Sequence, residues 1–328
     1  MKKNIAVVGC GHWGKNLVRN FAELGALAAV CDPNAELAKH YAEQYNVNNF
    51  SFAEIIKDAG IEGVVLAVPA PLHASLAIEA MNAGKHVYVE KPLAMNQIEA
   101  RQMIDTSKDQ GVQLMVGHLL QYHPVFIAVR ELVTSGELGG LSYIYSNRLS
   151  FGKVRSEEDV IWSFAPHDIS MILSLTGQEP ESVRTESASI LQSNIADTAT
   201  VHMAFTSGLK AHIFVSWLHP YKEQKLVVIG ESAMAVFDDT QPWEQKLALY
   251  RHNIDLTGEV PNLGKSDVQY IDVAQSEPLK NECQHFIDVV NGRLNPLTDG
   301  DEGLRVLNVL SAAALSQNEN NAVRIENL

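Results

Sequence analysis

Residues 1–120 alternate short apolar runs with longer segments whose apolar residues recur at helical spacing. The runs have the length and composition of strands buried on both faces, and the longer segments have the pattern of amphipathic helices. This alternation predicts a parallel sheet covered by helices on both faces, with right-handed crossovers. We expect helices over 12–24, 34–45, 72–83 and 96–110, and strands at Ile5–Val8, Leu27–Cys31, Val64–Val68, Val87–Val89 and Leu114–Val116.

The pattern changes near residue 140, where apolar and polar residues alternate in short runs separated by turn residues. Ser207-Gly208 and the segment 230–232 each separate two such runs and indicate hairpins. With helices expected near 124–135, 165–176, 280–291 and 301–317, this half predicts an α+β domain with a mostly antiparallel open sheet. The expected strands are Ser142–Leu149, Thr198–Phe205, Leu209–Trp217, Lys225–Ile229, Met234–Phe237, Leu247–Tyr250 and Val268–Val273.

The change of pattern divides the chain into a doubly wound α/β domain over 1–122 and an α+β domain over 123–328. A chain of 328 residues is long enough for two domains. The final helices could pack back on the first domain.

Composition and charge narrow the class of protein. Hydrophobic residues make up 46% and charged residues 20%, as in globular proteins, and the net charge of −14 argues against nucleic-acid or anionic-membrane partners. The three cysteines, Cys10, Cys31 and Cys283, indicate a reducing compartment and show no metal-ligand spacing, so no metal site is expected. No signal peptide or membrane span is apparent, so a cytoplasmic location is expected.

A glycine motif follows the first strand directly and opens a helix. Gly9 permits a tight turn, Gly11 lets a pyrophosphate approach the backbone, and Gly14 lets the helix pack closely on the strand. Asp32 ends the second strand about 20 residues further on, as in dinucleotide-binding Rossmann domains. A carboxylate there can bind the adenosine ribose hydroxyls and would repel a 2′-phosphate, which predicts NAD rather than NADP. The alternative is a glycine-rich turn followed by a helix-capping aspartate.

The five strands of the first domain all end in a glycine, a proline or a polar residue. Because parallel strands bind ligands outside their carboxyl ends, these positions are expected to share one edge of the sheet. In chain order they are Gly9, Asp32, Pro69, Glu90-Lys91 and Gly117-His118.

These motifs resemble the Gfo/Idh/MocA oxidoreductase family. The resemblance rests on the stretch Gly9–Gly14, Val68-Pro69 followed by His73, Glu90-Lys91-Pro92, and the segment Thr298–Arg305, and it covers essentially the whole chain. It implies a Rossmann domain followed by an α/β domain with an open antiparallel sheet that often makes oligomer contacts. It also implies oxidation or reduction of sugars, cyclitols and related compounds with NAD(P).

Lys91 is the candidate catalytic residue of the first domain. A partly desolvated lysine near the positively charged nicotinamide has a reason for a lowered pKa, and it could hydrogen-bond the reacting hydroxyl. Glu90 could orient Lys91, and a cis bond before Pro92 is expected, as in relatives. The alternative is a surface lysine with its charged end in solvent.

The resemblance and the strand ends together give a set of cofactor-binding residues. His118, Gln121, Tyr122 and His123 follow the fifth strand, where relatives carry an arginine and an aromatic residue, and they either line the pocket or form a plain loop. The expected cofactor-binding residues are Gly9, Gly11, His12, Trp13, Gly14, Asp32, Val68, Pro69, His73, Glu90, Lys91 and Gln121.

A second cluster runs from Trp162 to Asp168. Relatives often place an aspartate four residues before a histidine here; His167 matches the histidine, but Ser163 stands in place of the aspartate. His167 is the candidate general base, because its pKa lies naturally near neutral pH. Asp168 points in a different direction and could merely cap the helix. The alternative for His167 is a structural histidine at a helix start.

Within the family, the chain is most similar to bacterial sugar-nucleotide 3-dehydrogenases, on Gly14–Phe21, Trp162–His167 and Ser216–Pro220. This implies oxidation of the 3-hydroxyl of UDP-N-acetylglucosamine or its uronic acid, before an aminotransferase acts on the ketone on the way to a diamino sugar of a surface polysaccharide or lipid A. An acidic protein needs local cations to bind a diphosphate. The expected substrate-binding residues are Lys91, Arg148, Lys153, Arg155, Trp162, His167 and His219; the alternative for the three basic residues after 147 is a solvated loop.

Other functions on the same scaffold stay open. They are a cyclitol or simple sugar dehydrogenase, an NAD-dependent glycosidase, and a non-catalytic NAD-binding protein, although Glu90-Lys91-Pro92 and His167 argue against the last. A free sheet face in the second domain predicts a homodimer or homotetramer.

Overall fold

The computed structural model describes residues 2–152, 154–255, 257 and 260–327. The chain divides into two compact units, one formed by Met1–Tyr122 with Ser276–Leu307 and the other by His123–Gln275 with Asn308–Leu328. The division after Tyr122 coincides with the boundary expected from the sequence. Residues 276–307, assigned above to the second domain, belong instead to the first unit, as the final helices packing back on that domain would require.

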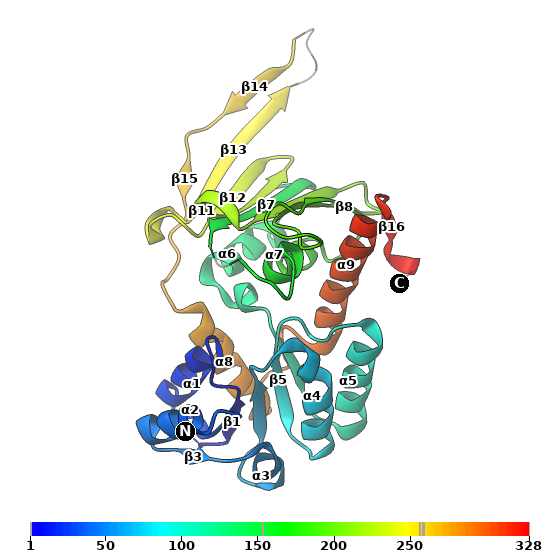
Figure 1. Cartoon of the computed structure of the whole chain (residues 1–328). Coiled ribbons are helices and arrows are strands. Elements are labelled where there is room, and N and C mark those ends of the chain that lie inside the picture. The colour runs from blue at the N-terminus through cyan, green and yellow to red at the C-terminus, as the bar shows by residue number, and fades with distance from the viewer. Residues whose placement is uncertain (1, 153, 256, 258–259, 328) are drawn as a thin grey trace. The chain divides into compact units, whose positions relative to one another are not determined.

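The first unit is built on a six-stranded parallel sheet with the order β3-β2-β1-β4-β5-β6 (Figure 1). All five apolar runs predicted in this region form strands, with ends that differ by at most two residues. Their side chains are almost completely buried, as strands covered on both faces require. The strands are β1 (Ile5–Val8), β2 (Leu27–Cys31), β3 (Asn48–Asn49), β4 (Gly63–Leu66), β5 (His86–Glu90) and β6 (Leu114–Gly117).

Side-chain caps begin three of the helices between these strands, α2, α3 and α5. The side chains of Asn34 and Asn96 accept backbone N–H groups of the first turn, and Ser51 forms a capping box with Glu54. Strand β3 and helix α3 were not predicted from the sequence, because β3 is two polar residues long and α3 has a single buried residue. The helical elements are α1 (Gly14–Glu23), α2 (Ala35–Tyr45), α3 (Phe52–Lys57), η1 (Ala70–Leu72), α4 (His73–Asn82), α5 (Gln97–Gln110) and η2 (Leu119–Tyr122).

The returning segment completes the first unit. Helix α8 (Pro278–Val290) packs against α1 and η2, and its apolar face, which includes Phe286, joins the core cluster. Before α9 (Gly300–Glu319), Thr298 makes two hydrogen bonds of 2.7 Å with the backbone of Val116. Its carbonyl oxygen accepts the Val116 N–H, and its hydroxyl donates to the Val116 carbonyl oxygen. Gly303 is required here, because a Cβ at this position would lie 2.8 Å from the Val116 side chain.

The second unit contains a ten-stranded sheet in which β7 and β10 pair in parallel and the other described pairs are antiparallel. The mostly antiparallel open sheet predicted from the sequence is thereby confirmed. Its strands are β7 (Leu141–Phe151), β8 (Ser182–Ala188), β9 (Thr198–Ala204), β10 (Lys210–Ser216), β11 (Leu218–Gly230), β12 (Ala233–Asp238), β13 (Leu247–Asp255), β14 (Asn262–Lys265), β15 (Gln269–Tyr270) and β16 (Val323–Arg324), with η3 (Trp243–Gln245) and η4 (Ile325–Asn327) as short turns.

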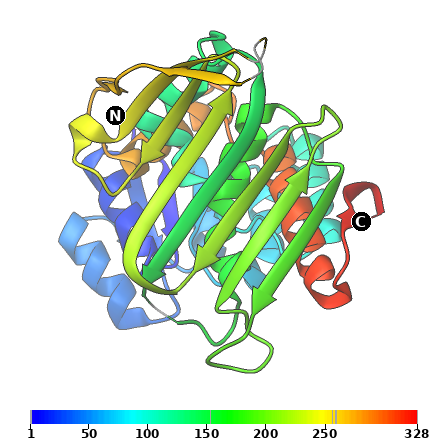
Figure 2. The same cartoon turned by 90° about the horizontal axis from the view of Figure 1, so that it is seen from above.

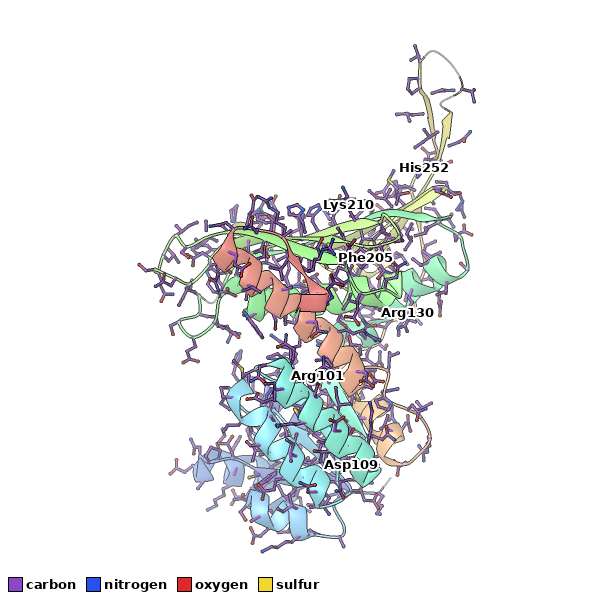
Figure 3. All side chains as sticks on the ribbon, turned by 90° about the vertical axis from the view of Figure 1, so that its right-hand side faces the viewer. Arg101, Asp109, Arg130, Phe205, Lys210 and His252 are labelled. Atoms are coloured by element: carbon purple, nitrogen blue, oxygen red, sulfur yellow. The ribbon has the colours of Figure 1, made fainter. Side chains whose placement is uncertain are left out.

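Helices cover one face of this sheet. Helix α6 (Pro124–Thr134) contacts β12, α7 (Val160–Thr176) contacts β7, β9 and β10, and Ser316 of α9 accepts the Thr185 N–H of β8. Figure 2 shows the other face, across which no described helix lies. Strands β13 and β14 continue as a hairpin beyond the rest of the sheet, and Figure 3 labels His252 on β13 and Lys210 at the start of β10. Within the described residues, every helix is too short or too polar to cross a bilayer.

Candidate cofactor and catalytic site

The glycine-rich loop has the geometry of a phosphate-binding turn. Gly9 has a φ of +94°, and a Cβ on it would lie 2.4 Å from the Ala67 carbonyl oxygen. A Cβ on Gly14 would lie 1.9 Å from the Gly9 carbonyl oxygen, so the start of α1 must pack directly on the turn. Gly11 differs, because no heavy atom would lie within 4 Å of its Cβ. That open space before a helix N-terminus is where a pyrophosphate can approach the backbone.

Asp32, at the end of β2, is fixed by the same loop. One carboxylate oxygen accepts the Cys10 N–H at 2.7 Å, and the other accepts the Asn34 N–H at 2.8 Å. A carboxylate has about four lone-pair positions, so two remain for ribose hydroxyls. The loop and this carboxylate therefore fit NAD, which Gly9, Gly11, Gly14 and Asp32 would hold.

His73, the first residue of α4, connects two of the segments that follow strand ends at this edge of the sheet. It was expected to bind the cofactor, but it is buried, and its ring nitrogens lie 2.7 Å from the Pro92 carbonyl oxygen and 3.0 Å from that of Val68. Burial lowers the pKa of His73. Because both nitrogens face backbone carbonyls, His73 ties the segment after β4 to the segment after β5, and its contact with the cofactor stays a prediction. The Lys91–Pro92 bond is cis, as expected.

Glu90, the last residue of β5, is the centre of a polar cluster. Its Oε1 accepts the indole N–H of Trp13 at 2.6 Å and the hydroxyl of Tyr88 at 3.0 Å. Gly117 leaves room for the side chains of Tyr88 and Glu90, since a Cβ there would lie 2.7 Å from the Tyr88 hydroxyl and 3.0 Å from Glu90 Oε2. Burial raises the pKa of Glu90, while Trp13, Tyr88 and the neighbouring Lys91 oppose that shift. Trp13 therefore links the cofactor loop to the carboxylate next to the candidate catalytic lysine.

The residues after β6 serve mainly the packing of the first unit. His118 Nδ1 lies 2.6 Å from a Glu302 carboxylate oxygen, and the Tyr122 hydroxyl lies 2.9 Å from Thr298 Oγ1. Gln121 is buried in η2. His123 belongs to the second unit and caps α6. His118 and Tyr122 thus anchor the returning segment, a role that their position after a strand did not reveal.

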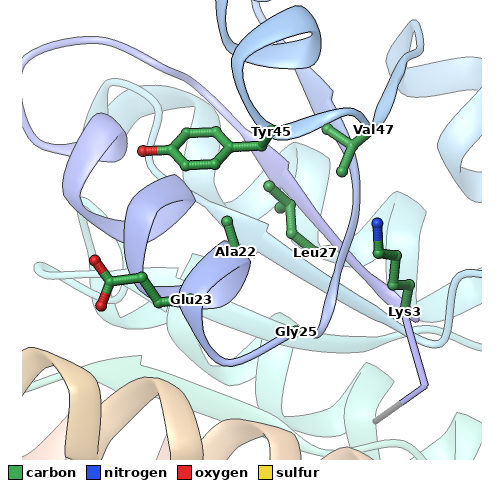
Figure 4. A pocket seen from close by; sticks show the side chains of 7 residues that line it. All are labelled: Lys3, Ala22, Glu23, Gly25, Leu27, Tyr45 and Val47. Atoms are coloured by element: carbon green, nitrogen blue, oxygen red, sulfur yellow. The ribbon is translucent and has the colours of Figure 1, made fainter.

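A hollow on the first unit lies at the opposite edge of the sheet (Figure 4). Its residues precede or begin the strands, so it is separate from the carboxyl-end site. It is lined by Lys3, Ala22, Glu23, Gly25, Leu27, Tyr45 and Val47.

In the second unit, α7 carries the second candidate cluster. The helix begins after Asp159, which accepts the N–H groups of Ile161 and Trp162 at 3.0 Å. It therefore starts five residues before the predicted start. Ser163 and His167 are one turn apart and share a helix face. His167 is half-buried.

Asp168 is not a helix cap. It is fully buried inside α7 and binds the guanidinium of Arg148 on β7, with Nε–Oδ2 at 2.6 Å and Nη2–Oδ1 at 3.1 Å. This pairing argues against Arg148 as a diphosphate ligand, because its charge is already neutralised. The pair could not be predicted from the sequence, because it joins a strand to a helix in the following segment.

The other expected substrate-binding residues are more exposed. Arg155 pairs with Glu158 at 3.3 Å, and Nδ1 of His219 on β11 lies 2.9 Å from the Tyr221 carbonyl oxygen, within hydrogen-bond distance. Trp162 is half-buried on α7. Lys153 lies outside the described residues.

Comparison with known proteins identifies the family. Residues 3–118 match the model of the oxidoreductase family with an NAD-binding Rossmann fold, and residues 126–236 match the Gfo/Idh/MocA C-terminal domain. The chain belongs to the Gfo/Idh/MocA oxidoreductase family. It is therefore an NAD-binding oxidoreductase of that family, as its motifs predict.

Individual Gfo/Idh/MocA relatives differ in substrate. The chain is 29% identical to UDP-N-acetylglucosamine 3-dehydrogenase of Acidithiobacillus ferrooxidans over 94% of each chain. A solved structure of that enzyme has a TM-score of 0.85 and covers 96% of this chain and 97% of its own, at 26% identity. Inositol 2-dehydrogenase of Rhizobium meliloti is 25% identical over 99% of this chain and 100% of its own.

Proposed function

We propose that the protein oxidises the 3-hydroxyl of a UDP-N-acetylhexosamine, or of its uronic acid, with NAD as the hydride acceptor. The observation that carries this proposal is the similarity, over 94% of both chains, to an enzyme named for the same reaction on UDP-N-acetylglucosamine. The Gly11 cradle and the Asp32 carboxylate support NAD as the cofactor.

The proposal gives each polar residue a task. NAD, when bound, accepts the hydride. Lys91 hydrogen-bonds the reacting hydroxyl and stabilises the negative charge that develops on its oxygen. Glu90, held by Trp13 and Tyr88, orients Lys91. His167 takes the hydroxyl proton as general base.

The diphosphate of the substrate needs cationic side chains. Arg148 is committed to Asp168, so the proposal assigns this task to Arg155 and Lys153, while Trp162 and His219 contact the sugar or the base. Arg155 is suited to it, because its ion pair with Glu158 is partly exposed and exchanges readily with an incoming phosphate.

A cyclitol dehydrogenase is the second candidate. It is favoured by the full-length similarity to the inositol 2-dehydrogenase of Rhizobium meliloti. Only the UDP-sugar needs cationic side chains outside the pocket for the reacting ring, because a cyclitol carries no phosphate.

The two candidates can be separated with one panel. The protein is incubated with NAD and with UDP-N-acetylglucosamine, its uronic acid, other UDP-sugars or myo-inositol, and the product masses are measured. We expect loss of two hydrogens from one of the two UDP-N-acetylhexosamines. Oxidation of myo-inositol alone would favour a cyclitol dehydrogenase, and release of free sugar would favour a glycosidase.

The expected homodimer or homotetramer remains a prediction. The uncovered sheet face carries Tyr145 stacked on His212, with ring centroids 5.4 Å apart, which supports an aromatic contact surface. Light scattering of the full-length protein would measure the oligomer.

A further inference from the structure

Glu282 of α8 is a carboxyl group in an apolar core. It is fully buried among cluster residues such as Cys283 and Phe286. Neither of its oxygens makes a well-formed hydrogen bond in the described part of the chain, although the hydroxyl of Tyr88 is near enough to lower its pKa. An isolated buried carboxylate is so costly that the group keeps its proton instead.

Among the described residues, the titratable groups that interact with Glu282 are themselves acids. These groups are Glu90 and Tyr88 on β5, Tyr122 on η2, and Cys283 on α8 itself. Burial raises the pKa of Glu282 well above its ordinary value, the carboxylate of Glu90 raises it further, and the Tyr88 hydroxyl opposes the shift. None of the four neighbours can offer a positive charge.

Burial raises the pKa of Glu90 as well, but Glu90 lies in a more favourable place for a negative charge than Glu282 does. Trp13 and Tyr88 donate hydrogen bonds to one of its oxygens, at 2.6 and 3.0 Å, and Lys91 is the next residue. Two interacting carboxyl groups with such different surroundings lose their first proton from the better stabilised member.

We propose that Glu90 and Glu282 hold one proton between them, that this proton resides on Glu282, and that Glu282 thereby keeps Glu90 charged beside Lys91. Glu282 is then a positioning residue, which acts on Lys91 through Glu90. This consequence rests on the proposed function of Lys91, whereas the place of the proton can be tested without any substrate.

A substitution separates this role from a merely structural one. Glu282→Gln keeps the shape of the side chain but cannot ionise. In the wild type, ionisation of Glu282 at alkaline pH adds a second negative charge near Glu90 and makes Lys91 hold its proton more firmly. We therefore expect the pH midpoint for acetylation of Lys91 by acetic anhydride, followed by peptide mass spectrometry, to be lower in Glu282→Gln than in the wild type. A purely structural role predicts the same midpoint in both.

The decisive measurement is infrared spectroscopy of the full-length protein at neutral pH in deuterated water. We expect the carbonyl band of a protonated carboxyl group to disappear in Glu282→Gln and to persist in Glu90→Gln. Any other pattern overturns the assignment. If Glu282→Gln does not fold, as judged by circular dichroism, the Glu90→Gln spectrum decides, since loss of the band there places the proton on Glu90. Failure to oxidise any UDP-sugar, with the predicted spectra, would reject the proposed function and leave the proton assignment intact.

Discussion

Arg148 and Asp168 form a bidentate ion pair that ties β7 to α7, with both charged side chains largely shielded from solvent. Ser146 donates a further hydrogen bond to the same carboxylate. The pair fixes the helix that carries His167, since Asp168 is the next residue along it.

Removing one partner of this pair should destabilise the fold. Loss of one member of a buried ion pair typically costs about 3–5 kcal/mol, because the other charge is left uncompensated. We expect Arg148→Ala to lower the thermal midpoint strongly, and the double variant with Asp168→Ala to be less unstable than the sum of the two single changes. Arg155→Ala is the matched control, because its exposed pair with Glu158 should contribute at most about 1 kcal/mol. Equal, small effects of the two arginine variants in calorimetry would contradict this assignment.

Two glycines of the cofactor loop should respond differently to alanine. The added methyl group of Gly11→Ala meets no atom of the described residues, so this variant should keep the wild-type thermal midpoint. It should lose NAD binding by at least about tenfold, because the methyl group fills the phosphate position. Gly14→Ala should destabilise the fold, because its Cβ would overlap the Gly9 carbonyl oxygen. Calorimetry and NAD titration of both variants check this. Normal NAD affinity in Gly11→Ala would place the pyrophosphate elsewhere.

Asp32 should determine the choice of cofactor. Asp32→Ser removes the charge that would repel a 2′-phosphate, while its hydroxyl can still accept one loop N–H. We expect weaker binding of NAD and a ratio of NADP to NAD affinity that rises by at least about tenfold. Titration with both cofactors measures the ratio; an unchanged ratio would mean that another group recognises the ribose.

Glu282 should make stability depend on pH. The pKa of Glu282 in the folded protein lies well above the ordinary glutamate value of 4.5. The folded state therefore binds this proton more strongly than the unfolded state does. The resulting contribution to folding stability is complete below pH 4.5 and is lost as pH rises toward the pKa of the folded state. Glu282→Gln has no such proton to lose, so its thermal midpoint should rise relative to that of the wild type as pH increases from 5 to 8. A pH-independent difference would show that Glu282 does not titrate in this way.

The sequence predicted the first sheet and its ligand-binding edge because buried parallel strands are apolar along their whole length. It missed β8, where only Val183 and Thr185 are buried and the other residues look like a loop. It misjudged Arg148, because the partner of this arginine lies on another element and no local pattern reveals it. Glu282 escaped notice for the same reason, since a single glutamate in an amphipathic helix usually faces solvent.

The central claim is hydride transfer from C3 of a UDP-N-acetylhexosamine to NAD at Lys91. It is tested most directly by incubating the protein with NAD and UDP-N-acetylglucosamine or its uronic acid carrying deuterium at C3, then extracting the cofactor for mass spectrometry. This detects reduced cofactor even if it stays bound. We predict deuterium in the nicotinamide ring for the wild type, with transfer slowed by orders of magnitude in Lys91→Ala and in His167→Ala. Absence of deuterium from the cofactor with both substrates, or full transfer by Lys91→Ala, would contradict the account.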